Sequence, residues 1–223
     1  SSVVAAGSYQ GGGYRAGSRS LPDPGQSDVF VLEMTDSGAV DWVVTGGSGT
    51  TIDVAGEVGL TSSVPFLLTA DKGEGSFCGS PLTERESVVA VRTDGALCSS
   101  HVGRLHGEDA EVPTTRDMQV PPTGAVPVAA LNLQQQFVDS WIELGPRLDG
   151  HGPVDVILVG YAADATSVRW QHQLGGPETE EAHAIDWVGA SELIVSGVFD
   201  STLALPGGAS LLASGSAPEV RFD

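Results

Sequence analysis

Two histidines that lie close together in the chain are the first candidates for metal chemistry. Glu108 and Asp109 lie shortly after His101 and His106, so imidazole nitrogens and carboxylate oxygens gather in one short segment. Both groups are common metal ligands, but no H-E-x-x-H pair or Cys/His zinc spacing contains them. We therefore predict solvated loop residues here, and a metal site at these positions is the alternative.

Acidic segments elsewhere offer oxygen ligands for calcium. The run Glu178-Thr179-Glu180-Glu181 is rich in carboxylates, yet it lacks the spaced D-x-D-x-D-G pattern of a calcium-binding loop. We predict no bound cofactor, and calcium is the one ion that these acidic loops leave open.

A pair of aspartates is the best candidate for catalysis. Asp53 and Asp186 both fall in predicted third strands of the repeat described below, where two carboxylates would be the acid and base of a polysaccharide hydrolase or lyase. The sequence contains no G-x-S-x-G nucleophile motif, and its glycine-rich segments lack the lysine of a phosphate-binding loop. We therefore favour a non-catalytic protein and keep the enzyme as the alternative.

The cysteines bear on the compartment in which the protein works. The chain has 2 of them, Cys78 and Cys98, 20 residues apart on either side of a predicted strand. A pair this close can join a loop to a strand, so we predict a disulfide and a secreted protein. Two unpaired thiols in a cytosolic protein are the alternative.

The charge balance restricts the partners. The chain has 10 Lys and Arg against 29 Asp and Glu, a formal net charge of −19. Such a surface repels phosphate backbones and anionic lipid heads, which argues against nucleic-acid and membrane-surface binding. Solubility, as in a saline habitat, explains the acidity most simply, and a cationic partner is the other explanation. No apolar run reaches the roughly 18 residues of a membrane span.

The elements that would position these residues follow a repeat. One strand phrase recurs with its matching residues at Val4, Leu67, Val128 and Ile194, at intervals of 63, 61 and 66 residues. A supersecondary unit copied in tandem has such a period, because each copy buries its apolar faces against its neighbours. The chain opens at Ser1-Ser2 inside such a phrase, so we expect either a removed signal or a piece of a longer protein. We predict a single domain over 1–223.

Each copy contains further strand signals. Runs rich in β-branched residues flank turns such as Asp36-Ser37-Gly38 and Thr93-Asp94-Gly95, as in an antiparallel hairpin. Glycines and a third strand follow, and we place that strand near Thr51–Val54, Val112–Val120 and His183–Val188. The composition of Thr179–Trp187 also suits a helix, which we reject by analogy with Thr51–Val54. Radial stacking of such four-stranded units gives a β-propeller.

We therefore predict an all-β fold, a β-propeller-like array of four-stranded antiparallel blades. Three complete blades correspond to repeats over approximately 27–70, 86–132 and 154–199, with partial strands over 1–9 and 219–223. A propeller ring typically needs four to eight blades, so we do not expect this chain to close a ring alone.

The order of these phrases resembles the bacterial β-propeller repeat called SBBP, which is found in secreted and surface-attached proteins. The best matches run from Asp28-Val29-Phe30-Val31 to Gly47 and from Val154 to Phe199. The middle copy departs from the pattern, with Ser99 where Trp42 and Trp170 stand. The resemblance implies a propeller and an extracellular or cell-surface location, and it implies no particular activity.

The expected function follows from these observations. We expect a non-catalytic binding or scaffolding module of a secreted or cell-surface bacterial protein. Its expected partner is another protein chain, either a second copy or the remainder of a longer parent, and a glycan is a further possible ligand. Loops at one end of the stacked strands would supply the recognition surface.

Overall fold

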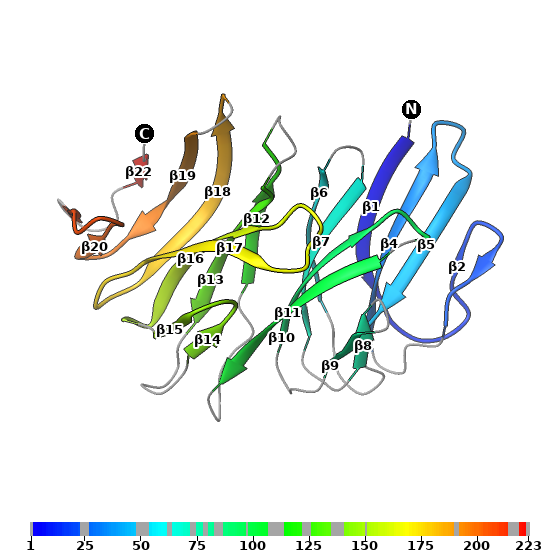
Figure 1. Cartoon of the computed structure of the whole chain (residues 1–223), viewed down its shortest axis with the longest axis horizontal. Helices are drawn as coiled ribbons and strands as arrows, with labels where there is room; N and C mark the ends of the chain where they lie inside the picture. Colours follow the sequence, from blue (N-terminus) through cyan, green and yellow to red (C-terminus); the bar gives the residue numbers. More distant parts are fainter. Residues whose placement is uncertain are drawn as a thin grey trace.

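The computed structural model of the chain shows an all-β protein (Figure 1). It describes residues 2–22, 27–47, 54–61, 64–71, 75–77, 80–82, 87–96, 98–106, 114–121, 126–134, 141–149, 151–189, 192–213 and 219–221. Every regular element in these ranges is a β-strand, which confirms the all-β part of the predicted fold. Within the same ranges no helix is long and apolar enough to cross a membrane.

The described residues form four antiparallel sheets of three or more strands, which we number in chain order. The first consists of β1 (Ser2–Tyr9), β4 (Asp28–Thr35) and β5 (Val40–Gly46). The main strands of the second are β6 (Val54–Thr61), β7 (Val64–Asp71), β10 (Ser87–Thr93) and β11 (Cys98–His106). The third consists of β12 (Thr114–Gln119), β13 (Val128–Gln134), β16 (Val154–Tyr161) and β17 (Val168–Leu174). The fourth consists of β18 (Glu180–Val188), β19 (Glu192–Phe199) and β22 (Glu219–Arg221).

The sheets stand side by side in chain order, with the first and fourth at opposite ends of the stack (Figure 1). Strand β12 contacts β6 and β7 of the second sheet on one side and β18 of the fourth sheet on the other. The sheets therefore stack face to face, as repeats that bury their apolar faces against neighbours must do.

The strands group into sheets differently from the prediction. A blade over 27–70 would unite β4, β5, β6 and β7, but β4 and β5 pair with β1, whereas β6 and β7 pair with β10 and β11. Among the described sheets only the second and third hold a full set of repeat strands, so the predicted three complete blades with single-strand ends are wrong. A period fixes the length of a unit but not its boundary, because every cyclic permutation of the strands has the same period.

A short hairpin follows the strand of the recurring phrase in each described repeat, after β1, β7, β13 and β19. No sequence pattern predicted these hairpins. These linking hairpins are β2 (Arg15–Ala16) with β3 (Arg19–Ser20), β8 (Gly75–Phe77) with β9 (Ser80–Leu82), β14 (Trp141–Glu143) with β15 (Arg147–Asp149), and β20 (Thr202–Ala204) with β21 (Ser210–Leu212). Three of them hydrogen-bond to the outer strand of the preceding sheet, through Gly47 with Ser76, β11 with β14, and Gly175 with Ala204. Each such hairpin thus ties one sheet to the sheet before it.

Matching irregularities confirm that the sheets are copies of one unit. The register of β4 with β5 shifts between Glu33 and Met34, and that of β16 with β17 shifts at the matching place, between Gly160 and Tyr161. The register of β12 with β13 and that of β18 with β19 likewise share a shift. Bulges are local features set by particular residues, so their recurrence indicates a structural repeat.

The hydrophobic core lies on both faces of the third sheet. One face includes Leu131, Ile157 and Val159. It packs against Leu144 and Leu148 of the β14–β15 hairpin, which extends the second sheet. The opposite face packs against the fourth sheet. Strands buried on both faces read as nearly continuous apolar runs, which is why β13 and β16 are so rich in Val, Ile, Leu and Ala.

The segment that also suited a helix is a strand. Glu180–Val188 forms β18 and pairs with β19 over its whole length, which confirms the prediction by analogy. The chain reaches β18 from β17 through Gly175 and Gly176. A Cβ at Gly176 would collide with the carbonyl oxygen of Thr202, so only glycine fits this crossing.

Candidate functional site

The residues predicted from sequence fall largely outside the described part of the chain. Asp53, Glu108 and Asp109 lie outside it, and so do the side chains of His101 and His106, whose backbone belongs to β11. The metal candidates and the pairing of Asp53 with Asp186 therefore stay predictions. The described residues contain no group of three or more His, Cys, Asp or Glu side chains arranged to hold a metal ion.

Two of the predicted residues can be placed. Asp186 is exposed on β18, and its Oδ1 accepts the N–H of Trp187 at 2.8 Å. Cys98 begins β11, opposite Thr93 in the β10–β11 ladder, and no described cysteine is a free thiol. Cys78 lies outside the described residues, so the disulfide between the two stays a prediction.

The described part of the chain instead brings two buried carboxyl groups to the Gly175-Gly176 crossing that leads from the third sheet to the fourth. Asp155 is the second residue of β16 and is 0% exposed, whereas Glu180 begins β18 and is 1% exposed. Asp155 stands where Asp28 stands in β4, so an aspartate at the start of this strand is a feature of the repeat. Fully buried carboxyl groups are uncommon unless they are paired.

Hydrogen bonds hold one oxygen of Asp155. Its Oδ2 accepts the backbone N–H of His151 at 2.7 Å and the side-chain amide of Gln173 at 3.2 Å. Its Oδ1 is buried, has no hydrogen-bond partner among the described residues and lies where a Cβ of Gly175 would be. Burial raises the pKa of Asp155, and the hydrogen bond from His151, together with the other interactions with His151, Gly152 and Gln173, opposes that rise only in part.

Glu180 has the same arrangement on the other side of the crossing. Its Oε2 accepts the N–H of Gly176 at 2.8 Å, and its Oε1 is buried without a hydrogen-bond partner among the described residues. Burial is the main reason that the pKa of Glu180 rises from 4.5 to about 7. The hydrogen bond from Gly176 lowers it, and the negative charges of Asp155, Asp200 and Glu178 raise it further.

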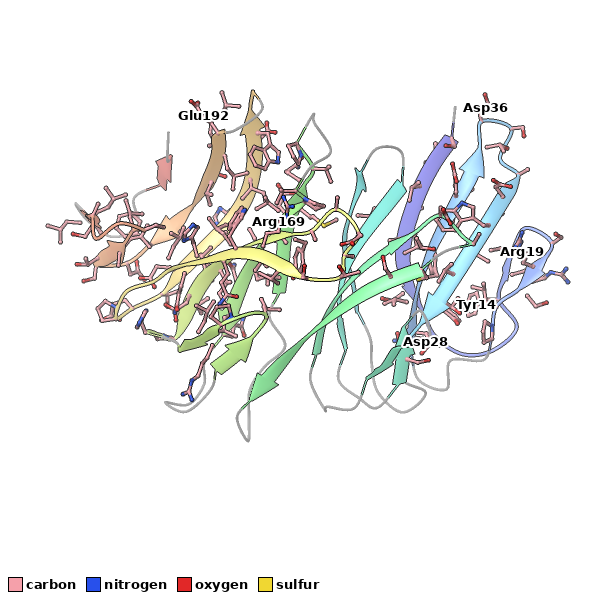
Figure 2. The ribbon with its side chains drawn as sticks, viewed as in Figure 1. Tyr14, Arg19, Asp28, Asp36, Arg169 and Glu192 are labelled. Carbon is pink, nitrogen blue, oxygen red and sulfur yellow. The ribbon has the colours of Figure 1, made fainter. Side chains whose placement is uncertain are left out.

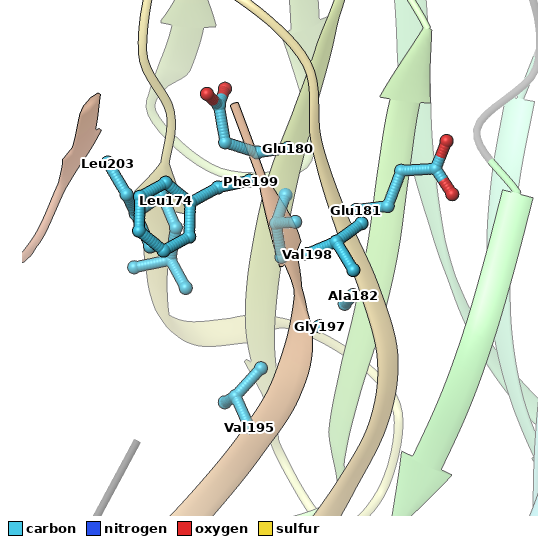
Figure 3. Close-up of a pocket in the computed structure, with 10 residues that line it drawn as sticks. Leu174, Glu180, Glu181, Ala182, Val195, Gly197, Val198, Phe199 and Leu203 are labelled. Atoms are coloured by element: carbon cyan, nitrogen blue, oxygen red, sulfur yellow. The ribbon is translucent and has the colours of Figure 1, made fainter. Parts of the chain in front are cut away.

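The surroundings of Glu180 explain why burial dominates. The residue borders an apolar cavity of about 10 Å³, which is close to the smallest volume that holds one water molecule. Phe199, Leu174 and Leu203 line the same cavity to one side of Glu180, and its carboxylate points away from Val195 and Val198 (Figure 3). A charge at this position therefore gains little from solvent, which favours the protonated form.

Polar side chains fasten the seam between the third and fourth sheets. The amide of Asn132, 0% exposed in β13, donates to the carbonyl of Ala182 at 3.2 Å and accepts the N–H of Ala182 at 2.9 Å. The carboxylate of Asp117 accepts the N–H of Ile185 at 2.9 Å, and Arg116 lies 3.7 Å from Glu181. Asn132 thus serves β18 as a substitute for a neighbouring strand, beside the bulge that interrupts the pairing of β18 with β19.

This arrangement can join two sheets and hold a proton between them. Asp155, Glu180 and Asn132 are each at most 1% exposed, so no substrate reaches them in this conformation. Sequence reasoning considered Glu180 only as part of an acidic run and did not consider Asp155 or Asn132. The available signal was a polar residue inside an otherwise apolar strand, as in Val128–Gln134 and Val154–Tyr161.

Comparison of the sequence with models of protein families gives no match, and comparison with curated proteins gives none either.

Proposed function

We propose that this chain is a non-catalytic binding or scaffolding module, built as a β-propeller-like array, of a secreted or cell-surface bacterial protein. The observation that carries the proposal is the use of buried polar chemistry between the sheets. Asn132 and Asp117 of the third sheet form hydrogen bonds with the backbone of the fourth, whereas Asp155 forms its hydrogen bonds within the third sheet. Groups used in this way stabilise an extended surface and leave recognition to the loops.

The propeller arrangement is part of this proposal. Its support is that the sheets stack face to face and that the first strand of the third sheet, β12, contacts both β6 and β18, as neighbouring blades of a propeller do. The resemblance to the SBBP repeat and the predicted disulfide between Cys78 and Cys98 support an extracellular location.

An enzyme acting on polysaccharides is the second candidate. The exposure of Asp186 favours it, because a catalytic carboxylate has to reach its substrate. Asp155 and Glu180 have raised pKa values, as a general acid requires, but their burial keeps them from a substrate.

One experiment separates the two functions. The purified chain is incubated with a panel of acidic and neutral polysaccharides, and both binding and the release of reducing or unsaturated ends are measured. The proposal expects binding of some partner without turnover, equal in the wild type and in the Asp53→Asn and Asp186→Asn variants. Turnover that the wild type shows and both variants lose would establish the enzyme and refute the proposal.

A further inference from the structure

The outer face of the first sheet, which we call the head face, is apolar. It consists of Val3, Ala5, Phe30, Leu32, Met34 and Val43, which the ladders of β1, β4 and β5 place on one side. The opposite side of the same sheet, with Val29 and Val31 at 0% and 1% exposure, faces the rest of the stack. Val3 is 57% exposed, and the others of the head face are partly exposed.

Matching positions in the third sheet show what normally covers such a face. By register, Phe30, Leu32 and Met34 correspond to Ile157, Val159 and Tyr161. These three residues are at most 1% exposed, and they pack in one cluster with Leu144 and Leu148 of the β14–β15 hairpin, which belongs to the second sheet. The head face therefore has the residue types of a covered face of the repeat.

The fourth sheet ends the stack at the other side with a second partly exposed face, which we call the tail face. It consists of Glu192, Ile194, Ser196 and Val198 of β19 and Ala184, Asp186 and Val188 of β18. Their counterparts in β13 are Val128, Ala130 and Asn132, all at 0% exposure under the next sheet. A shallow hollow of about 550 Å³ lies on this face beside Val188, Glu192 and Ile194.

The two faces lie at opposite ends of the molecule. Figure 2 shows Glu192 at the fourth sheet and Asp36 at the first, separated by the whole length of the stack. One copy therefore does not cover its own head face with its own tail face. A second copy of the chain offers to each face the kind of contact that it has inside the repeat.

We propose that two copies of this chain dock head to tail, with the head face of one copy on the tail face of the other. This inference rests on the proposed scaffolding function. The same junction already exists inside the chain, between the third and fourth sheets. There Val128 and Ala130, on the face equivalent to the tail face, pack against Ile185 and Val195, on the face equivalent to the head face. The intermolecular contact continues that stack by one more junction.

The geometry of the contact sets its symmetry. Head and tail faces are different surfaces, so the interface is heterologous and closes only if the sheets curve into a ring. Two copies would contribute eight sheets in all, since each has four, which falls within the four to eight blades of known propellers. A net charge of −19 on each copy opposes the contact at low salt, and added salt screens that repulsion.

Light scattering coupled to size exclusion tests the proposal at low and high salt. The expected result is a mass of twice 22.8 kDa, more fully populated at high salt. Leu32→Asp places a charge on the head face and Ile194→Asp places one on the tail face, and each variant should run at the monomer mass. Ala39→Asp adds the same charge in the exposed β4–β5 turn of the first sheet and should stay dimeric.

Mixing the variants tests the head-to-tail arrangement directly. The Leu32→Asp chain keeps a normal tail face and the Ile194→Asp chain keeps a normal head face, so an equimolar mixture should recover a dimer. A mixture that stays monomeric overturns the arrangement, and so does a wild type that is monomeric at both salts. Val3→Asp, at a position that is already 57% exposed, provides a second head-face variant if Leu32→Asp does not fold. A monomeric wild type leaves the binding function intact, because that function is tested by ligands and turnover.

Discussion

Exchange of Glu180 for glutamine should change how the stability of the protein depends on pH. The carboxyl group is 1% exposed, and only one of its oxygens has a hydrogen-bond donor among the described residues. The rise of its pKa from 4.5 to about 7 corresponds to about 3 kcal/mol between the two protonation states. Glutamine has the shape of the protonated acid, keeps an acceptor for the N–H of Gly176 and carries no charge.

The direction of the effect follows from proton linkage. Glu180 binds its proton more tightly in the folded chain than in the unfolded chain, whose value is 4.5. The contribution to the free energy of unfolding is therefore fully present below about pH 4.5 and is lost as the pH rises through about 7. The variant lacks this group, so the free energy of unfolding of the variant minus that of the wild type should increase by about 3 kcal/mol from pH 4 to pH 9.

Urea denaturation in steps of pH measures this difference. The matched control is Glu192→Gln, which removes the same charge from an exposed position of the same sheet. Its difference from the wild type should change by less than about 1 kcal/mol, as expected for an exposed charge. Parallel curves for Glu180→Gln and the wild type between pH 4 and pH 9 would show that Glu180 is not the buried proton-binding group.

Three further experiments test the seam and the cysteines. Gly176→Ala should lower the free energy of unfolding by about 1–3 kcal/mol, because the added methyl group meets a backbone carbonyl. Gly145→Ala, where the nearest atom is 3.5 Å from the new Cβ, should have little effect, and an equal loss for both variants would refute the steric argument. Asn132→Ala should lower the free energy of unfolding in urea by about 2–4 kcal/mol, since it leaves a buried backbone donor and acceptor without partners, and an unchanged urea midpoint would show that the pair contributes nothing. Intact mass after alkylation, with and without reductant, tests the disulfide, and alkylation of both Cys78 and Cys98 without reductant would refute it.

The sequence was sufficient to predict an all-β fold and a repeated arrangement of strands. Short β-branched runs between glycine and aspartate turns predicted strands throughout, and the analogy with Thr51–Val54 correctly overruled the helix at Thr179–Trp187. Those signals are local, or they depend only on a period. The boundary of each sheet is neither, because it depends on which strands exchange hydrogen bonds.

The linking hairpins and the buried carboxyl groups were beyond the reach of the same reasoning. Strands as short as Arg15–Ala16 or Thr202–Ala204 carry too little alternation to be recognised in a sequence. Glu180 was one acid in an acidic run, and its burial depends on Gly176 and on the apolar residues of a neighbouring sheet. Tertiary packing, and no local pattern, makes this glutamate different from Glu178.

The polar contacts between the sheets address a difficulty that every stacked repeat has. Because the sheets are copies, their apolar faces are alike, and apolar packing alone does not strongly favour one neighbour over another. A directional hydrogen bond is available only to the correct neighbour. The hydroxyl of Ser99 in the second sheet donates to the carbonyl of Asp164 in the third, at a position where the other copies carry tryptophan.

Asn132 has the same role at the next seam, where its side-chain amide pairs with the backbone of Ala182. The residue of β1 that corresponds to Asn132 is a serine, Ser8. The two junctions thus carry different polar contacts on similar apolar faces. Stacking a sheet on the wrong copy would leave these groups buried without partners, which costs about 1–3 kcal/mol for each group. We infer that apolar residues provide the stability of the stack and that these few polar residues determine its order.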